Sequence, residues 1–470
     1  MTPRSLLPLL LVALAAAQAQ AQVKLIAIGS LSGQYEDLAH VTAPALENGI
    51  PGNRLGGLGS GLAYAGGTTF LALPDRGPNA KAYNSAVDDT ASYIPRFHTL
   101  DLSLAPSDPG SPLPFVLTPS LRDTTLLSSS QPLVYGTGKA YGLPGGAPAL
   151  NTRHTFYFSG RSDNFDATRP STHPLNGRLD PEGIRVSRDG RSVFISDEYG
   201  PFLYQFDRHS GRRVRAFQLP AKFAVHNLSP RGDVEISGNT AGRVANKGME
   251  GLAITPDGRT LVGAMQSPLL QDGGTNAPFI RLVAVNLRTG ATREYAYELT
   301  NIGTAAKPKY PTVSELLAIN EHEFLVDERD GKGLGDGSAA GYKRIYRIDL
   351  NGAQDVSGLI GAANLAGKAV TKSLFLDVVA ALGAQGYSPE QIPAKLEGLA
   401  FGPDVQVDGT SKHTLFLAND NDFSAVITDS LHPTGAANPN QFFVFAFSDN
   451  ELPGFAPQRF CGEEADRDED

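Results

Sequence analysis

The chain contains no tryptophan, three methionines and a single cysteine, Cys461. One cysteine excludes an internal disulfide framework, and no histidine-rich segment surrounds Cys461, so we interpret it as incidental. After the N-terminal segment no apolar run approaches the roughly 18 residues that a membrane span requires, so we expect no membrane span. P-loop, dinucleotide-binding, nucleophile-elbow and zinc-ligand motifs are also absent. Chemistry in this protein therefore has to come from a different arrangement of residues.

Basic residues are outnumbered: 40 lysines and arginines stand against 49 aspartates and glutamates, a net charge of −9. Nucleic acids are bound through a basic face that contacts the phosphate backbone, so we expect no nucleic-acid partner. Charged residues make up only 19% of the chain, while 51 glycines and 33 prolines are present. This composition favours many short strands joined by turns.

The N-terminus has the pattern of a secretory signal peptide over residues 1–21. Arg4 supplies a positive charge, a short apolar run follows to Ala17, and small residues alternate up to Ala21. This order is typical of a cleaved export signal. We therefore expect an exported protein, periplasmic or extracellular, with association with the cell envelope left open. The other end, residues 459–470, is predicted to be a solvated acidic tail.

A unit of four short β-type runs recurs along the chain. In one copy, the run that starts at Pro181 is followed by runs over 192–197, 202–207 and 214–219, with Asp189-Gly190 and Ser210-Gly211 at turns. Apolar and polar residues alternate in these runs, as they do in half-buried strands. Repeats of this length and content predict the four-stranded blades of a β-propeller.

Five copies of the unit are recognisable. The marker residues, at the equivalent position near the start of each copy, are Ser60, Glu182, Glu250, Glu315 and Glu397. The first interval is nearly twice the later ones, so we favour six blades, with five as the alternative, in a single domain over residues 22–458. The run from Val23 to Ile28 is predicted to pair with the last blade and close the ring. Apolar spacing over 371–382 predicts a short helical insertion.

The marker residues predict an acidic channel. The first strand of each propeller blade lines the central channel, so equivalent positions converge there. Four carboxylates in one channel repel one another unless cations neutralise them, and oxygen ligands in this number favour Ca²⁺ or another hard divalent ion. The predicted metal ligands are Glu182, Glu250, Glu315, Glu397, Asp420 and Asp422. The structural alternative is that each Glu accepts backbone N–H bonds from the next blade.

A second set of charged residues ends the second strand of each unit. It is predicted to supply the catalytic and phosphate-binding groups at the rim of the same channel: Asp75, Arg76, Asp197, Glu198, Asp327 and Arg329, with Lys247 beside Glu250. Arginine and lysine are suited to pair with phosphate oxygens. The set therefore points to a small phosphorylated substrate.

Several of these segments resemble a known family. Asp75-Arg76-Gly77-Pro78-Asn79, Pro181-Glu182-Gly183-Ile184, Asp197-Glu198-Tyr199-Gly200-Pro201 and Asn246-Lys247-Gly248-Met249-Glu250 are similar to motifs of the phytase-like family called "esterase-like activity of phytase". The segments around Glu397 and Asp420 match it too. The resemblance implies a secreted bacterial β-propeller with phosphoesterase or phosphodiesterase activity. Ser60 in place of Glu, and Leu316 after Glu315 in place of Gly, depart from the pattern.

Three functions are compatible with this sequence. The first is a metal-dependent hydrolase of phosphoric esters, in which Ca²⁺ neutralises the substrate phosphate and a bound water attacks phosphorus. The second is a non-catalytic propeller that Ca²⁺ stabilises, and the third is a lactonase-like sugar hydrolase with a channel metal. Turnover of phosphate esters or lactones with and without Ca²⁺ distinguishes them.

Overall fold

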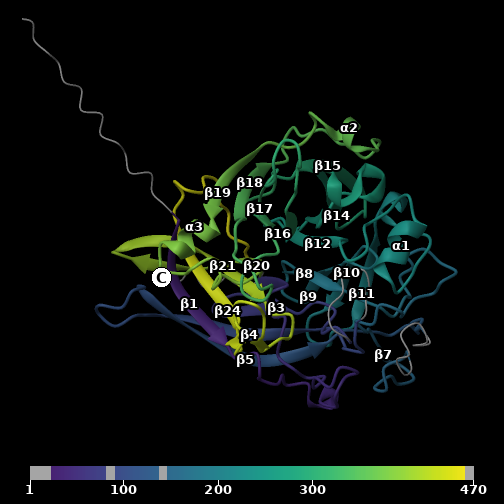
Figure 1. Ribbon diagram of the computed structural model, residues 1–470, viewed down its shortest axis with the longest axis horizontal. Coiled ribbons are helices and arrows are strands. Elements are labelled where there is room, and N and C mark those ends of the chain that lie inside the picture. Colours follow the sequence, from purple (N-terminus) through teal and green to yellow (C-terminus); the bar gives the residue numbers. More distant parts are fainter. Residues whose placement is uncertain (1–22, 81–89, 137–145, 461–470) are drawn as a thin grey trace, which may run out of the picture.

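The computed structural model describes residues 23–80, 90–136 and 146–460. The predicted signal peptide, Cys461 and the acidic residues after it lie outside this part. The described residues form five four-stranded antiparallel sheets, arranged around a centre as the blades of a propeller (Figure 1). The predicted all-β propeller is confirmed.

Each blade runs from an inner strand at the channel to an outer strand at the rim. Blade 1 contains β2 (Gly61–Tyr64), β3 (Thr69–Leu73), β4 (Arg96–Pro106) and β5 (Phe115–Leu126). Blade 2 contains β8 (Pro181–Val186), β9 (Ser192–Asp197), β10 (Phe202–Asp207) and β11 (Arg213–Gln218). Blade 3 contains β12 (Met249–Ile254), β13 (Thr260–Met265), β14 (Phe279–Asn286) and β15 (Thr292–Glu298). Blade 4 contains β16 (Thr312–Ala318), β17 (Glu323–Arg329), β18 (Lys343–Asp349) and β19 (Lys372–Asp377).

Blade 5 joins the two ends of the chain. It contains β20 (Lys395–Val407), β21 (Thr410–Asp420), β24 (Asn440–Phe447) and the N-terminal strand β1 (Lys24–Leu31). β1 pairs with β24 along its length, from Lys24 opposite Ala446 to Leu31 opposite Asn440. The predicted closure by the N-terminal strand is thus confirmed, and the open edge that β24 would otherwise present is paired.

The preference for six blades is wrong. Between β5 and β8, the described residues contain only β6 (Ser128–Ser129) and β7 (Phe156–Tyr157), which pair with each other. The inner strands pack in the cyclic order β2, β8, β12, β16, β20 and back to β2. The ring is therefore complete without a sixth sheet, and the long first interval is an insertion rich in glycine and proline.

The helix predicted over 371–382 is wrong in its first half. Lys372–Asp377 is the outer strand β19, and only Val378–Gly383 forms the helix α3. The Asp377 side chain accepts a hydrogen bond from the Ala380 N–H at 3.0 Å and so caps this helix. Strand pairing with β18 outweighs the helical spacing of the apolar residues.

The other helices are short and lie in loops. They are α1 (Gly232–Gly238), α2 (Ala362–Leu365) and the 3₁₀ turns His40–Thr42, Ala221–Phe223, Leu270–Asp272 and Gly274–Asn276. Within the described ranges, no helix has both the length and the apolar character needed to cross a membrane.

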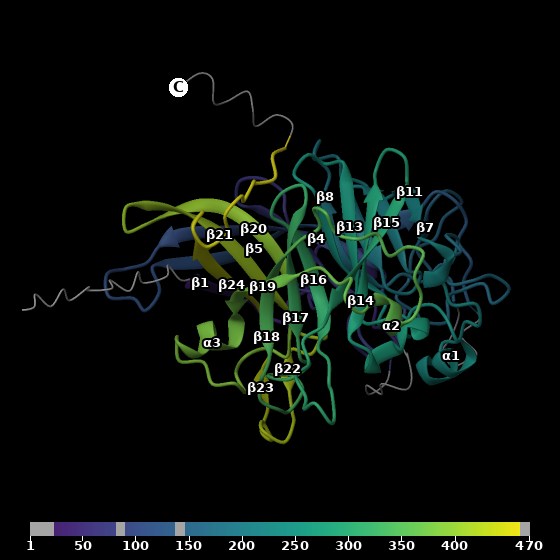
Figure 2. The same ribbon diagram turned by 90° about the horizontal axis from the view of Figure 1, so that it is seen from above.

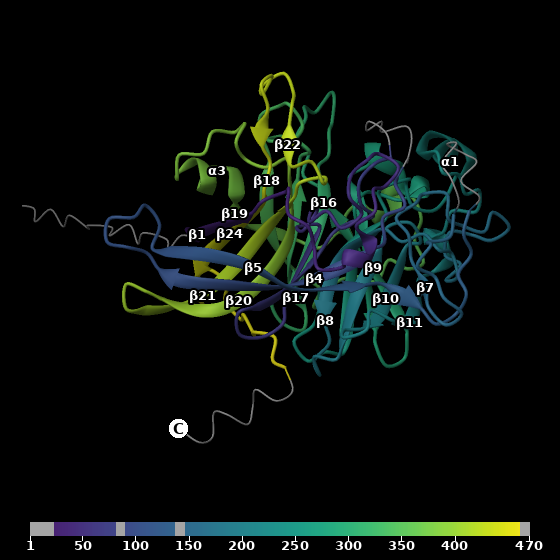
Figure 3. The same cartoon turned by 90° about the horizontal axis from the view of Figure 1, so that it is seen from below.

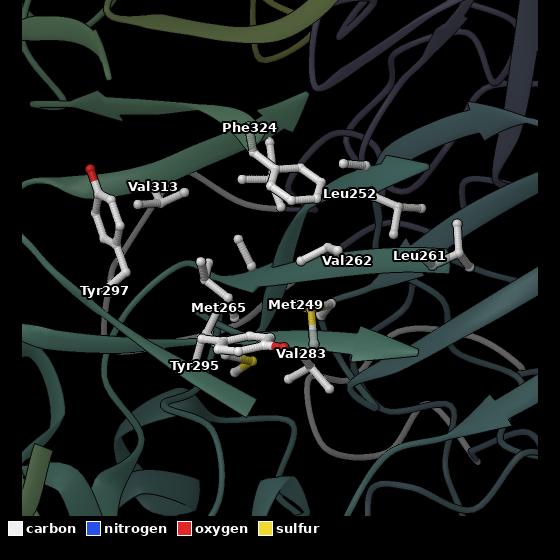
Figure 4. Close-up of a cluster of buried hydrophobic side chains, with 14 of the residues drawn as sticks. Met249, Leu252, Leu261, Val262, Met265, Val283, Tyr295, Tyr297, Val313 and Phe324 are labelled. Carbon is white, nitrogen blue, oxygen red and sulfur yellow. The ribbon is translucent and has the colours of Figure 1, made fainter. Parts of the chain in front are cut away.

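Apolar side chains from neighbouring blades pack between the sheets. Figure 4 shows one such cluster, where Leu252, Val262 and Met265 of blade 3 lie near Val313 and Phe324 of blade 4. Every residue of the inner strands β8 and β12 is buried, so each side chain there must be apolar or have a specific partner. Glu182 in β8 and Glu250 in β12 are therefore each expected to need a specific partner.

The two faces of the ring differ. Figures 2 and 3 show the hairpin of β22 (Val426–Ile427) and β23 (Ala436–Ala437) on the opposite face from the last described segment, which is yellow and follows β24; we call the hairpin side the front face. On the rear face the Gln458 side chain donates to the Val186 carbonyl at 2.8 Å, and the Phe460 ring lies 6.1 Å from that of Tyr64. Phe460 is buried, so the solvated tail predicted from residue 459 begins too early.

Candidate functional site

The inner strands carry β-bulges near the front face, and glutamates occupy three of them. Glu250 has no pairing partner between Met249 and Gly251, and Glu397 has none between Leu396 and Gly398. The shift in β8 spans Glu182. A bulge leaves one residue out of the ladder and re-aims its side chain. These glutamates are between 3% and 7% exposed, and the ring of inner strands brings them together.

Glu315 does not share this position, so its predicted equivalence is wrong. In β16 the residue left out of the ladder is Ser314, and Glu315 pairs with Asp327. The Glu315 carboxylate accepts the Leu252 N–H at 2.9 Å and forms an ion pair with Arg185 at 3.0 Å. Burial raises the pKa of Glu315 to about 7. Glu315 therefore fastens blade 4 to blade 3, as the structural alternative describes.

Three buried carboxylates of blade 2 form one acidic group. Asp180, Glu182 and Glu198 each offer an oxygen within 4.8 Å of the other two, and their exposed fractions are 0%, 7% and 1%. The pKa of Glu182 is raised well above its usual value, first by burial and then by neighbouring carboxylates, beginning with Glu250. Burial also raises the pKa of Glu198, and Asp180 adds to the effect.

The Glu182 side chain makes no hydrogen bond or ion pair with the described residues, although Glu182 is only 7% exposed. Buried carboxylates are normally paired with a cation or hydrogen-bond donors, because desolvation of an unpaired charge costs several kcal/mol. A proton or a cation is therefore needed to balance the Glu182 carboxylate. Three convergent carboxylates and no sulfur or imidazole ligand fit a hard divalent cation such as Ca²⁺.

The residues behind the acidic group fix its geometry. The Arg76 backbone N–H and its Nη1 donate to the two Asp180 oxygens at 3.1 and 2.9 Å. The Gly248 N–H donates to Glu198 Oε1 at 3.0 Å. Asp197 accepts the Asp180 N–H at 3.1 Å, and burial raises its pKa to about 7. Arg76 and Asp197 thus hold Asp180 in place.

A second acidic group lies beside the first and contains its own cation. Asp75, Asp420 and Asp422 have oxygens within 4.8 Å of one another. The Lys395 ammonium donates to Asp420 at 2.8 Å and also to Asp422. Burial raises the pKa of Asp75 well above its usual value, and Asp420 is the next cause. Lys395 neutralises part of this group, as Arg76 does for Asp180 in the blade 2 group.

Two further cations approach from blades 3 and 4. Arg329 donates through Nη2 to Glu397 and through Nε to Ser314 Oγ at 2.8 Å. Lys247 donates to Gln266 Oε1 at 3.0 Å.

The Gln266 side chain also contacts Glu250 and so links Lys247 to this channel carboxylate. Its amide donates to Glu250 Oε1 at 2.8 Å. The other Glu250 oxygen is buried and has no partner among the described residues. Burial raises the pKa of Glu250 to about 8, with Glu397 adding to it.

The family model of the phytase-like proteins, described as "Esterase-like activity of phytase", matches residues 53–423, a range that includes all these charged groups. The chain belongs to this family. A secreted protein of the fungus Arthroderma benhamiae is 29% identical to this phytase-like chain over 69% of each chain. Among solved structures, the Malassezia sympodialis allergen Mala s 1 is 12% identical, with 85% of this chain and 79% of that chain covered and a TM-score of 0.35. Kuenenia stuttgartiensis hydrazine synthase is 9% identical over 78% of each chain, with a TM-score of 0.30.

The phytase-like propeller gathers most of the predicted site residues at the front end of its channel. They are Asp75, Glu182, Glu198, Lys247, Glu250, Arg329, Glu397, Asp420 and Asp422. Asp327 of β17 lies opposite Glu315 of β16, further from the front end than Arg329, which ends β17. Burial raises the pKa of Asp327 well above the usual value. Asp327, Glu315 and Asp197 thus lie behind the front groups, whereas Arg76 is paired with Asp180 and lowers the pKa of Glu198 and Asp422 through its charge.

Sequence reasoning missed two members of the site. Asp180 stands two residues before Glu182, and Lys395 stands two residues before Glu397. Both thus lie close in the chain to a channel glutamate, just before the bulge that holds it. A search for charged residues at this spacing would have found both.

Proposed function

We propose that this phytase-like propeller is an exported, metal-dependent hydrolase of phosphoric esters that acts at the front end of its channel. The observation that carries the proposal is the Asp180, Glu182 and Glu198 group, in which the buried Glu182 carboxylate has no partner among the residues that the structure describes. Export is supported by the N-terminal signal pattern and by the fungal relative, which is named as a secreted protein.

Ca²⁺ is the cation that suits this group best. It takes six to eight oxygen ligands in flexible geometry, and carboxylates bind it through one or both oxygens. Asp180, Glu182 and Glu198 would hold it, with water or substrate completing the ligand set. A bound divalent ion supplies neutralisation of phosphate charge and a bound water of lowered pKa.

The surrounding residues define what the protein itself contributes. Arg76 keeps Asp180 oriented, and Gly248 does the same for Glu198. The unpartnered oxygen of Glu250 is available to accept a proton from an attacking water, since a general base works best with a pKa near the working pH. Lys247, Arg329 and Lys395 lie among the carboxylates of the same channel end, which supports a phosphate ester as substrate.

The test is turnover by the mature protein after removal of metal with a chelator. Aryl phosphomonoester, aryl phosphodiester, phytate and lactone substrates are compared with and without added Ca²⁺. We expect Ca²⁺-dependent hydrolysis of a phosphate ester, and a loss of at least about 10- to 100-fold in Glu182→Gln, because even the loss of a residue that supports a metal ligand costs this much. Glu321→Gln, an exposed carboxylate, is the matched control.

Two results would contradict the proposal. The absence of turnover on every substrate, together with a large Ca²⁺-dependent gain in melting temperature, would identify a non-catalytic, Ca²⁺-stabilised propeller. Hydrolysis restricted to lactones would identify the sugar-hydrolase alternative.

A further inference from the structure

The last described segment of the chain, Leu452–Phe460, lies on the rear face (Figure 3). We call it the rear strap, and it contains no helix or strand. It starts on blade 5, where the Phe455 ring lies 4.4 Å from that of Phe401. It then reaches blade 4, where the Ala456 N–H donates to the carbonyl of Ile319, just after β16, at 2.8 Å. The rear strap thus connects two blades without belonging to either sheet.

The end of the rear strap reaches blades 2 and 1. The Gln458 side chain donates at 2.8 Å to the carbonyl of Val186, which ends β8. Phe460 is buried in the apolar cluster that β2 and β8 share, and its ring lies 6.1 Å from that of Tyr64, which ends β2. A segment that leaves blade 5 therefore contacts the rear ends of inner strands from three other blades.

A small cavity lies under the rear strap, on the axis of the channel. Pro457 and Gln458 of the rear strap line it together with residues of all five inner strands, among them Leu62, Arg185, Ile254, Leu317 and Ala400. Since every inner strand contributes, the cavity is the rear part of the channel itself. Its volume of about 50 Å³ is well below the roughly 150 Å³ that admits a benzene ring. The covered rear end therefore leaves no passage for an organic substrate.

Arg185 separates this cavity from the acidic groups at the front end. It follows Glu182 on β8 in the direction of the rear face and is 2% exposed. Its Nη1 donates to the Leu62 carbonyl of blade 1 at 2.7 Å, and its Nη2 donates to the Leu316 carbonyl of blade 4 at 2.8 Å. Blade 3 stands between blades 2 and 4 in the ring, so this side chain spans the channel. The ion pair with Glu315 holds it there.

We infer that the rear strap is a latch that seals the rear end of the channel, so that the acidic groups are reached from the front face. The seal has two layers, the Arg185 side chain inside the channel and the rear strap across its mouth. The rear strap belongs to no sheet, so its release breaks no strand pairing and can occur by local opening. It also ties blade 5 to blades 1, 2 and 4, in addition to the pairing of β1 with β24. A seal of this kind is independent of the reaction at the front end.

Thiol labelling of the folded protein tests the seal. Ala318→Cys places a thiol at the rear cavity, and Thr410→Cys places one at an exposed position as the matched control. Each substitution is made in the full mature chain carrying Cys461→Ser, in a chain that ends at Phe460, and in a chain that ends at Gly454 and so lacks most of the rear strap. Every one of these proteins then has a single thiol.

We expect a soluble maleimide to label Ala318→Cys at least about tenfold faster in the chain that ends at Gly454, because the thiol is then reached without local opening. The rate should be the same in the other two chains, and Thr410→Cys should be labelled equally in all three. Equal rates for Ala318→Cys in folded chains with and without the rear strap would overturn the inference. If the chain that ends at Gly454 does not unfold cooperatively in urea, Gln458→Ala combined with Phe460→Ala loosens the rear strap in the full chain instead, and unchanged labelling there is the contrary result.

Calorimetry with Ca²⁺ distinguishes a rear seal from a part of the front site. Arg185 still spans the channel when the rear strap is gone, so Ca²⁺ affinity should be unchanged in the folded chain that ends at Gly454. A fall in Ca²⁺ affinity there would make the rear strap part of the metal site and contradict the seal. Absence of Ca²⁺ binding in every chain would refute the proposed metal site, while faster labelling of Ala318→Cys would still support the seal.

Discussion

Replacing Glu182 by Gln should change stability in opposite ways with and without Ca²⁺. The substitution preserves size and removes one carboxylate from a group of three whose oxygens lie within 4.8 Å of one another. Without metal, removal of the charge relieves repulsion and desolvation, so the free energy of unfolding should stay equal or rise at alkaline pH. With metal, a ligand is lost, so the stabilisation by Ca²⁺ should shrink.

The size of the second effect follows from binding linkage. At a Ca²⁺ concentration of about 100 times the dissociation constant, binding adds about 2.7 kcal/mol to the free energy of unfolding. If loss of a ligand weakens binding about 100-fold, the same concentration adds only about 0.4 kcal/mol. The variant should therefore lose about 2 kcal/mol of stability in Ca²⁺, while losing none in chelator.

Urea unfolding of both proteins, in Ca²⁺ and in chelator, measures this difference. The slope of the unfolding free energy against urea concentration should be the same in all four experiments. Glu321→Gln, an exposed carboxylate, should follow the wild type in both conditions. The reasoning is refuted if Glu182→Gln gains as much stability from Ca²⁺ as the wild type does. It is also refuted if the variant is less stable than the wild type in chelator, since Glu182 would then have a stabilising protein partner.

Three further predictions concern the groups around the site. Burial raises the pKa of Glu250 to about 8 in the folded protein. The stabilisation by its protonated form is therefore complete below the pKa of about 4.5 in the unfolded chain and is lost as the pH rises through 8. The metal-free protein should have a lower urea midpoint at about pH 8.5 than at about pH 7, and an equal or higher midpoint contradicts this. Glu315→Ala should cost about 3 to 5 kcal/mol, with and without Ca²⁺, because it leaves Arg185 buried without its ion-pair partner; a loss seen only in Ca²⁺ would instead give Glu315 a metal-binding role. Gly248→Ala should weaken Ca²⁺ binding in calorimetry, because its Cβ would lie 2.1 Å from the Glu198 carbonyl oxygen, whereas Gly358→Ala, which faces open space, should bind as the wild type does.

The blade count illustrates what the sequence could not determine. Four-strand units were legible because alternation and Asp-Gly or Ser-Gly turns are local patterns. The long first interval has no such pattern, and length alone cannot distinguish a degenerate blade from an insertion. The count is decided by packing of β2 directly against β8, which closes the ring at five sheets.

The sequence by itself determined that the channel is acidic. A strand repeat places a Glu near the start of several inner strands and charged residues where the second strands end. Tertiary structure decided which carboxylates meet. Side chains alternate between the faces of a strand, so a one-residue bulge decides whether Glu or its neighbour points into the channel. In β16 this bulge falls on Ser314, which turns Glu315 into a fastener. Asp180 joins Glu182 and Glu198 because Arg76 donates to its carboxylate and its own backbone N–H donates to Asp197, contacts that local patterns in the chain do not contain.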